Sequence, residues 1–302
     1  AASTTNLNGV TVAENTAFTG GGLLNEQGAM NLLNVTVAKN TAFFGGGVYN
    51  DDFGPTNQWA TTMVVNRSAI VFNSATDVNC PYYLMGPGAL CGAGGGLFNE
   101  NGDVNVVNST VAENTAATYG AGLYSMRIGL ATVSQAILRL NNATVSANRT
   151  GSFGGGVLNN AGTLQMRNSI IAGNFRGAIA DDCFVMMAGS VNTSFGNNIS
   201  SVAHCGLNQA TDKVTSPKLA PLAVYGGSTL SMMPLPGSPA LNNGDNGACA
   251  ASPVSNLDQR GNARPLGAKC DIGAIEGELT TPVQPVVPTP VIRVQPKPKR
   301  GG

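Results

Sequence analysis

The chain has 302 residues, 11% of them charged, and its 16 Lys and Arg residues balance 16 Asp and Glu. A neutral chain without a basic stripe is not typical of nucleic-acid-binding proteins, and no apolar run approaches the roughly 18 residues that indicate a membrane span. We therefore expect no nucleic-acid partner and no membrane span. Aromatic residues make up only 6% of the chain while Gly reaches 40 residues, which favours a thin all-β fold with frequent turns.

One phrase, "NVTVAKNTAFFGGGVYN" at residues 34–50, recurs in imperfect copies along the first half of the chain. Three residues before each "AxN" Asn stands Val or Ile, and most of these Asn residues are followed by a glycine cluster and then Leu or Val. The alternation of small or β-branched residues predicts short strands with one buried face. The recurring Asn positions are Asn15, Asn40, Asn73, Asn114, Asn148 and Asn174.

Such a repeat cannot bury its apolar face alone, but stacked copies can. We therefore predict an all-β fold, a right-handed parallel β-helix (solenoid), over residues 1–215. Each turn of chain would lie about 4.8 Å above the last. A buried amide without partners costs about 1–3 kcal/mol, so the recurring Asn residues are expected to form a hydrogen-bonded ladder. The glycine clusters are expected where backbones approach too closely for a Cβ atom.

Three insertions lengthen the repeat, and we expect them to bulge outward as tolerated decoration or as a recognition surface. They are residues 51–62, 74–93 and 125–136. Six cysteines lack the CxxC spacing of a zinc site, and one His is too few for mixed ligation. Disulfides in an exported protein are therefore expected. Of fifteen possible connectivities, neighbours in sequence would pair Cys80 with Cys91, Cys183 with Cys205, and Cys249 with Cys270.

The repeats resemble those of bacterial parallel β-helix surface proteins, including the chlamydial polymorphic outer membrane proteins. The stretch "LPGSPALNNGDNG", continued by "DQRGNARP" and "CDIGAIEG", resembles the terminal segment of the choice-of-anchor Q family of exported β-helix proteins. This resemblance covers roughly residues 5–276 and implies an exported surface location and a solenoid closed by the terminal segment. The chain departs from the family pattern at residues 241–243, where an acidic residue usually precedes the "GD".

The last third divides into two segments. Residues 216–276 are predicted to be an irregular, disulfide-linked cap, because their prolines exclude regular interior strands. The charged residues of this cap are expected either to form a salt-bridge cluster or to bind a ligand such as calcium: Asp258, Arg260, Arg264, Asp271 and Glu276. Residues 277–302 form a Pro-rich extended tail. Within it, Val291, Ile292 and Val294 could add as an edge strand to a neighbouring copy.

Catalysis is not expected. The adjacent carboxylates Asp51-Asp52 and Asp181-Asp182 could act as an acid–base pair only at suitable separation, and neither lies in a hydrolase-like context. His204 is the only histidine and is expected to be structural. The glycine runs are not followed by the GK[ST] of a phosphate loop. We predict no catalytic residue, no metal and no cofactor.

Sequons of the N-x-[ST] type are candidate glycosylation sites. Three of them, Asn34, Asn108 and Asn142, share one column of the repeat, six residues before the ladder Asn. If the alternation holds, these side chains point outward, so surface glycosylation is an open alternative there.

The leading functional hypothesis is an exported structural protein that self-assembles, head to tail, into an extracellular filament or surface layer. The start "AASTTN" resembles a mature terminus after signal-peptide cleavage. No amphipathic helix precedes the first repeat, so its edge would be exposed and prone to pairing. The alternative is a cell-surface adhesin or carbohydrate-binding module with glycans as partners, and a polysaccharide lyase or hydrolase comes third.

Overall fold

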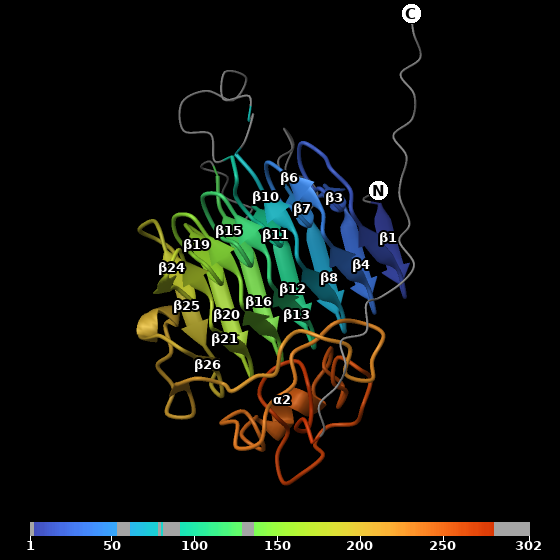
Figure 1. Ribbon diagram of the computed structural model, residues 1–302, viewed down its shortest axis with the longest axis vertical. Helices are drawn as coiled ribbons and strands as arrows, with labels where there is room; N and C mark the ends of the chain where they lie inside the picture. The colour runs from blue at the N-terminus through green and yellow to red at the C-terminus, as the bar shows by residue number, and fades with distance from the viewer. Residues whose placement is uncertain (1–2, 53–60, 78–79, 81–90, 129–135, 281–302) are drawn as a thin grey trace, which may run out of the picture.

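The computed structural model describes residues 3–52, 61–77, 80, 91–128 and 136–280. In this part of the chain it is nearly all-β, and its strands form four stacked sheets (Figure 1). All of its strand pairs are parallel except β22–β23 (Phe175–Arg176 and Ile179–Ala180). The described helices are short: the 3₁₀ helix η1 (Ala203–Cys205) and α2 (Asn246–Ala250).

Successive turns of the chain add strands to the same sheets, so that strands far apart in sequence become neighbours. The first sheet contains, in spatial order, β1 (Thr4–Asn8), β4 (Ala29–Leu33), β8 (Thr62–Asn66), β12 (Asp103–Val107), β16 (Ile137–Asn141), β20 (Thr163–Arg167) and β25 (Val191–Ser194). The second sheet contains β2 (Thr11–Ala13), β5 (Thr36–Ala38), β9 (Ala69–Val71), β13 (Thr110–Ala112), β17 (Thr144–Ser146), β21 (Ile170–Ala172), β26 (Ile199–Ser200) and β27 (Lys213–Val214).

The other two sheets complete each turn. The third sheet contains β23, β22, β18 (Arg149–Thr150), β14 (Thr115–Ala116), β10 (Ser74–Ala75) and β6 (Thr41–Ala42). The fourth sheet contains β24 (Cys183–Val185), β19 (Val157–Asn160), β15 (Leu123–Met126), β11 (Leu97–Glu100), β7 (Val48–Asp51) and β3 (Leu23–Glu26).

The apolar interior is built from equivalent residues of successive turns. In the second sheet the register places Val12 beside Val37, and the column continues through Ile70, Val111, Val145 and Ile171. Facing residues of the other sheets, such as Leu97 and Leu138, are also fully buried. One contiguous core thus runs the length of the stack, and burial of the repeated Val, Ile and Leu side chains stabilises it.

Tight corners between the sheets need left-handed backbone. The residue between the first and second sheets has a positive φ in successive turns, for example 54° at Asn34 and 51° at Asn142. The glycine cluster makes another corner. A Cβ atom on Gly47 would lie 2.6 Å from the carbonyl oxygen of Gly96 and 2.9 Å from the Asn73 side chain. The glycines therefore recur with the Asn residues because the two pack directly against each other.

The C-terminal segment, residues 216–280, does not close an end of the stack. It lies along one side, on the outer face of the second sheet (Figure 1). Its Leu230 and Met232 pack with Ala38 of an early turn, while Ile272 packs with Ile199 of a late one. The expectation of an end cap is therefore wrong: the outer face of the second sheet carries Ala, Val and Ile side chains that need cover, and this segment supplies it.

Candidate functional site

The recurring Asn residues form one hydrogen-bonded column. Each contributes its backbone N–H and its side-chain Nδ2 as donors to Oδ1 of the Asn in the next turn, as Asn73 does to Asn114 at 2.9 and 3.0 Å. Nδ2 also donates to a Val or Ile carbonyl oxygen of the preceding turn, such as Val37 O at 2.9 Å. The same pattern links Asn15, Asn40, Asn73, Asn114, Asn148 and Asn174. Every amide points the same way, so the column has a direction.

Asp182 ends this column. Its Oδ1 accepts the N–H and Nδ2 of Asn174 at 3.0 and 3.1 Å, and its Oδ2 accepts from the Ser200 hydroxyl at 3.0 Å and from Ser201. The neighbouring Asp181 accepts from Gly154 N at 2.9 Å. Both carboxylates are buried and occupied by structural donors, so this pair is not arranged as a catalytic acid and base.

Each of the three disulfides joins cysteines that are neighbours in the sequence: Cys80–Cys91, Cys183–Cys205 and Cys249–Cys270. Cys183–Cys205 ties β24 to η1, and Cys205 packs with the partly buried Leu207 on the apolar interior of the last turn. His204 lies next to it in η1. The loop around η1 thus covers part of the interior at this end of the stack.

The candidate glycosylation column is not uniformly exposed. Asn34 is half-buried, but Asn108 and Asn142 are fully buried under the C-terminal segment. Asn108 Nδ2 donates to Val254 O at 3.4 Å, and Asn142 Nδ2 to Cys249 Sγ at 3.3 Å. The expectation that these side chains point to solvent is wrong for Asn108 and Asn142, because residues 216–280 cover their turns.

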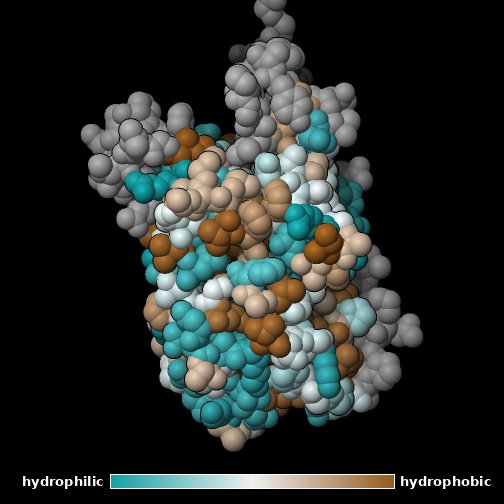
Figure 2. All heavy atoms as spheres, turned by 90° about the vertical axis from the view of Figure 1, so that its left-hand side faces the viewer, coloured by the Kyte–Doolittle hydropathy of each residue, from teal (hydrophilic) through white to brown (hydrophobic). Residues whose placement is uncertain are grey.

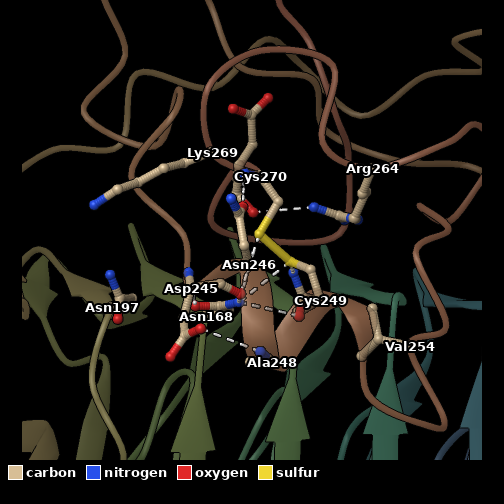
Figure 3. The surroundings of a disulfide bond; sticks show 12 residues. Asn168, Asn197, Asp245, Asn246, Ala248, Cys249, Val254, Arg264, Lys269 and Cys270 are labelled. Carbon is tan, nitrogen blue, oxygen red and sulfur yellow. Dashed lines mark hydrogen bonds between the residues drawn. A yellow bond between two sulfur atoms is a disulfide. The ribbon is translucent and has the colours of Figure 1, made fainter.

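The same segment is fastened by amides of the neighbouring turn. Asn168 accepts from the backbone N–H of Asp245 at 2.9 Å, and its Nδ2 donates to Asp245 O at 3.1 Å and to Cys249 Sγ at 3.3 Å (Figure 3). The Cys249–Cys270 disulfide therefore sits directly against Asn168 of the stack, where it joins α2 to the irregular chain around Cys270.

The charged residues of the C-terminal segment form ion pairs and hydrogen bonds within the segment itself. Arg264 is fully buried and donates to Glu276 Oε2 at 3.1 Å and to Gly273 O at 2.8 Å. Arg260 pairs with Asp258 at 2.7 Å. Burial raises the pKa of Asp271 and of Glu276. Their oxygens accept backbone N–H groups, which fits a structural cluster better than a calcium site. The described residues contain no group of three or more His, Cys, Asp or Glu side chains placed to hold a metal ion.

Two of the sheets have outermost strands with no further described strand beside them at either end of the stack. At one end β1 and β3 are the outermost strands of the first and fourth sheets; at the other, β25 and β24 are. The third sheet ends instead in the antiparallel β22–β23 hairpin. Figure 2 views the end that carries β24 and β25 and shows separate hydrophobic patches among hydrophilic ones.

Apolar side chains are exposed at both ends. Phe18 and Leu24 of the first turn are 44% and 40% exposed. At the other end Val185 in β24 is 43% exposed and Val191 in β25 is 49% exposed. Exposed apolar side chains beside a free strand edge are a recognised site of strand-to-strand association. The expected assembly residues Val291, Ile292 and Val294 lie outside the described residues.

Sequence reasoning missed Asp182 as the end of the Asn column and the alternating polar side chains of the first sheet. The sequence did carry a signal for these alternating side chains: "DVNVV", "ILRLN" and "TLQMR" each precede a repeat and alternate polar with apolar residues.

Comparison with protein-family models, with curated proteins and with solved structures gives no match. In the part of the chain that the structure describes, no helix has the length and apolar character needed to span a bilayer.

Proposed function

We propose that this chain is an exported structural protein that associates with copies of itself through the two ends of its stacked sheets. The fold that we propose for the stack is a right-handed parallel β-helix. The in-register pairing of β4, β8, β12 and β16 supports it, and the right hand rests on the strong preference of parallel crossover connections.

One observation supports this proposal above all. The outermost strands at both ends of the first and fourth sheets have no further strand beside them among the described residues, and all strands of these sheets run parallel. A second copy translated along the stack would bring its β1 beside β25 and its β3 beside β24 without reversing any strand. Such a head-to-tail contact does not close on itself, so repetition gives a filament.

The exposed apolar side chains favour the same contact. In an unshifted register Val191 would lie beside Thr4 of the next copy. Val185 would lie beside Asn25, and Leu24 beside Phe184. Burying each aliphatic side chain contributes about 1.5–3 kcal/mol at most. The third sheet, closed by its hairpin, would not take part. Three disulfides fit an oxidising, extracellular setting, which supports export.

A double variant of the exposed edge tests the proposal. Val185→Lys with Val191→Lys places charges on the free strands, where Lys is a common barrier to edge pairing. The wild-type chain is expected to form concentration-dependent oligomers in sedimentation velocity and fibres in negative-stain images, and the double variant is expected to remain monomeric.

Leu266→Lys is the matched control, because Leu266 is 75% exposed but lies on the C-terminal segment, away from either end. It should assemble like the wild type. A wild-type chain that stays monomeric at its highest soluble concentration would overturn the proposal, as would a double variant that assembles as well as the control.

The proposed fastening role of the Pro-rich tail needs a separate experiment. A chain ending at Thr280 keeps every described strand and should fold with an unchanged urea midpoint. If the tail fastens the joint, this shorter chain will give fewer and shorter fibres; fibres of unchanged length would remove the tail from the proposal and leave the strand edges in it.

A further inference from the structure

A shallow pocket of about 220 Å³ lies on the outer face of the first sheet and reaches Phe195, which directly follows the end strand β25. Its polar lining comes from three adjacent strands, and Pro253 of the C-terminal segment forms one wall. The side chains that matter for its chemistry are Asn105, Arg139, Asn141, Gln165, Arg167 and Phe195.

The strand register produces the polar row of this pocket. Asn105 in β12 is paired with Arg139 in β16, and Arg139 with Gln165 in β20. Their apolar neighbours Val104, Leu138 and Leu164 are fully buried on the opposite face. Hydrogen-bonding side chains therefore stand side by side at the strand spacing of about 4.8 Å.

The two arginines of the pocket differ in their partners. Arg139 forms an ion pair with Asp103, and its Nε donates to Gln165 Oε1 at 3.2 Å. The Arg167 guanidinium lies over the Phe195 ring, 5.2 Å from its centroid, and forms no ion pair with any described residue. The pocket thus holds one arginine whose charge is balanced and one whose charge is not.

We propose that this pocket binds the carboxylate group of an acidic saccharide, with Arg167 as its charged partner. A guanidinium matches a carboxylate by two parallel hydrogen bonds. The amides of Asn105 and Gln165 offer both donors and acceptors, which suits the neighbouring hydroxyl groups of a sugar. Phe195, which is 49% exposed, supplies an apolar edge for the ring. The proposal does not rest on the proposed assembly, because Gln165 and Arg167 lie on β20, which is not an end strand of the first sheet.

The test is isothermal titration calorimetry of the full chain with trigalacturonic acid at low salt. Galactotriose serves as a neutral saccharide control, and acetate as a carboxylate control without a sugar. Arg167→Gln is expected to weaken binding of the acidic trisaccharide at least tenfold. Arg149→Gln is the matched control, because the Arg149 guanidinium lies 4.7 Å from the centroid of the Phe175 ring, on the third sheet and outside the pocket. This variant should bind the acidic trisaccharide as tightly as the wild type does.

Weaker binding at higher salt, together with no binding of galactotriose or acetate, would support the proposal, since an exposed ion pair is screened by salt. Four results would overturn it: no heat of binding with trigalacturonic acid, equal binding of galactotriose, equal losses of affinity in Arg167→Gln and Arg149→Gln, or equal binding of acetate.

Discussion

Ala147 stands in a left-handed position, with a φ of 59°, directly before the ladder residue Asn148. The equivalent residue of the next turn is Gly173, with a φ of 73°. Left-handed backbone costs a residue with a Cβ atom about 1–2 kcal/mol, while glycine loses about 0.5–1 kcal/mol of chain entropy in return. Ala147→Gly should therefore raise the free energy of unfolding by about 0.5–1 kcal/mol in urea denaturation. Ala172→Gly, in the buried strand β21, should lower it; a loss of stability in Ala147→Gly would contradict the strain argument.

Glu100 shows a second effect at the scale of single residues. The register stacks it on Asp51, which stacks on Glu26, and Tyr49 donates its hydroxyl proton to the Glu100 carboxylate. Burial raises the pKa of Glu100, so the folded state binds this proton more tightly than the unfolded chain. The stability from this group is complete below its unfolded pKa and is lost as the pH rises through its folded pKa.

Glu100→Gln should remove the loss of folding stability that accompanies ionisation of Glu100 as the pH rises. The variant is expected to unfold at a higher urea concentration than the wild type at pH 7 and at a similar one at pH 4, because only the wild type has a carboxyl group to ionise at position 100. The exposed Glu113→Gln is the control and should follow the wild type at both pH values. A gap between wild type and Glu100→Gln that does not depend on pH would contradict this assignment.

At the scale of elements, the Asn column behaves as one unit because its hydrogen bonds all run in the same direction. A neutral amide could not end it well: the final position must accept from Asn174 on one oxygen and from Ser200 and Ser201 on the other. A carboxylate has four acceptor sites and no donor, which is what Asp182 provides.

Asp182→Asn should therefore cost about 2 kcal/mol of unfolding free energy, because the new NH₂ group faces donors and one buried acceptor is lost. Asp181→Asn is the comparison. The Asp181 carboxylate accepts one hydrogen bond, from Gly154, and lies 4.0 Å from Nε of the partly exposed Arg176, so its replacement should cost less. Urea denaturation with the disulfides intact measures both. Equal costs would show that the end of the column has no special importance.

The sequence predicted much at this scale and failed where distant segments meet. The recurring phrase around each Asn predicted the Asn column, and closeness in the sequence suggested the cysteine pairs, since both are local features of the chain. Asp182 was not recognised because the β22–β23 hairpin shortens the turn and breaks the repeat. Asn34 and Asn142 share a column and a left-handed φ, yet only Asn142 is fully buried. Nothing in their local sequence encodes which turn the C-terminal segment covers.

At the scale of the whole molecule, the C-terminal segment acts as a side support. Gln259 shows how: its side chain accepts from the Thr110 hydroxyl at 2.6 Å and donates to Ser68 O and Leu230 O at 3.2 and 2.8 Å. Segment and stack are joined by fully buried polar contacts as well as by apolar packing. Because this support runs lengthwise, it stabilises several turns together, while the end strands β1 and β25 have no further described strand beside them.

The proposed contact between β25 of one copy and β1 of the next has a strand register that can be tested. If the first sheet continues from one copy into the next without a shift, Thr193, which follows Gln165 in register, should lie opposite Asn6, which precedes Asn31. All six native cysteines are in disulfides, so an added cysteine is the sole free thiol of its chain. Adjacent strands hold their Cα atoms within the range that a disulfide spans.

A mixture of Thr193→Cys and Asn6→Cys chains should therefore give a covalent dimer on mild oxidation, seen on a non-reducing gel. A mixture of Thr193→Cys with Ser255→Cys, whose exposed position lies on the C-terminal segment, should not. Dimer formed equally in both mixtures would mean random collision rather than an ordered joint. Because parallel strands must slip by two residues to keep their inward faces inward, a dimer with Asn8→Cys in place of Asn6→Cys would show a shifted joint between the same two edges.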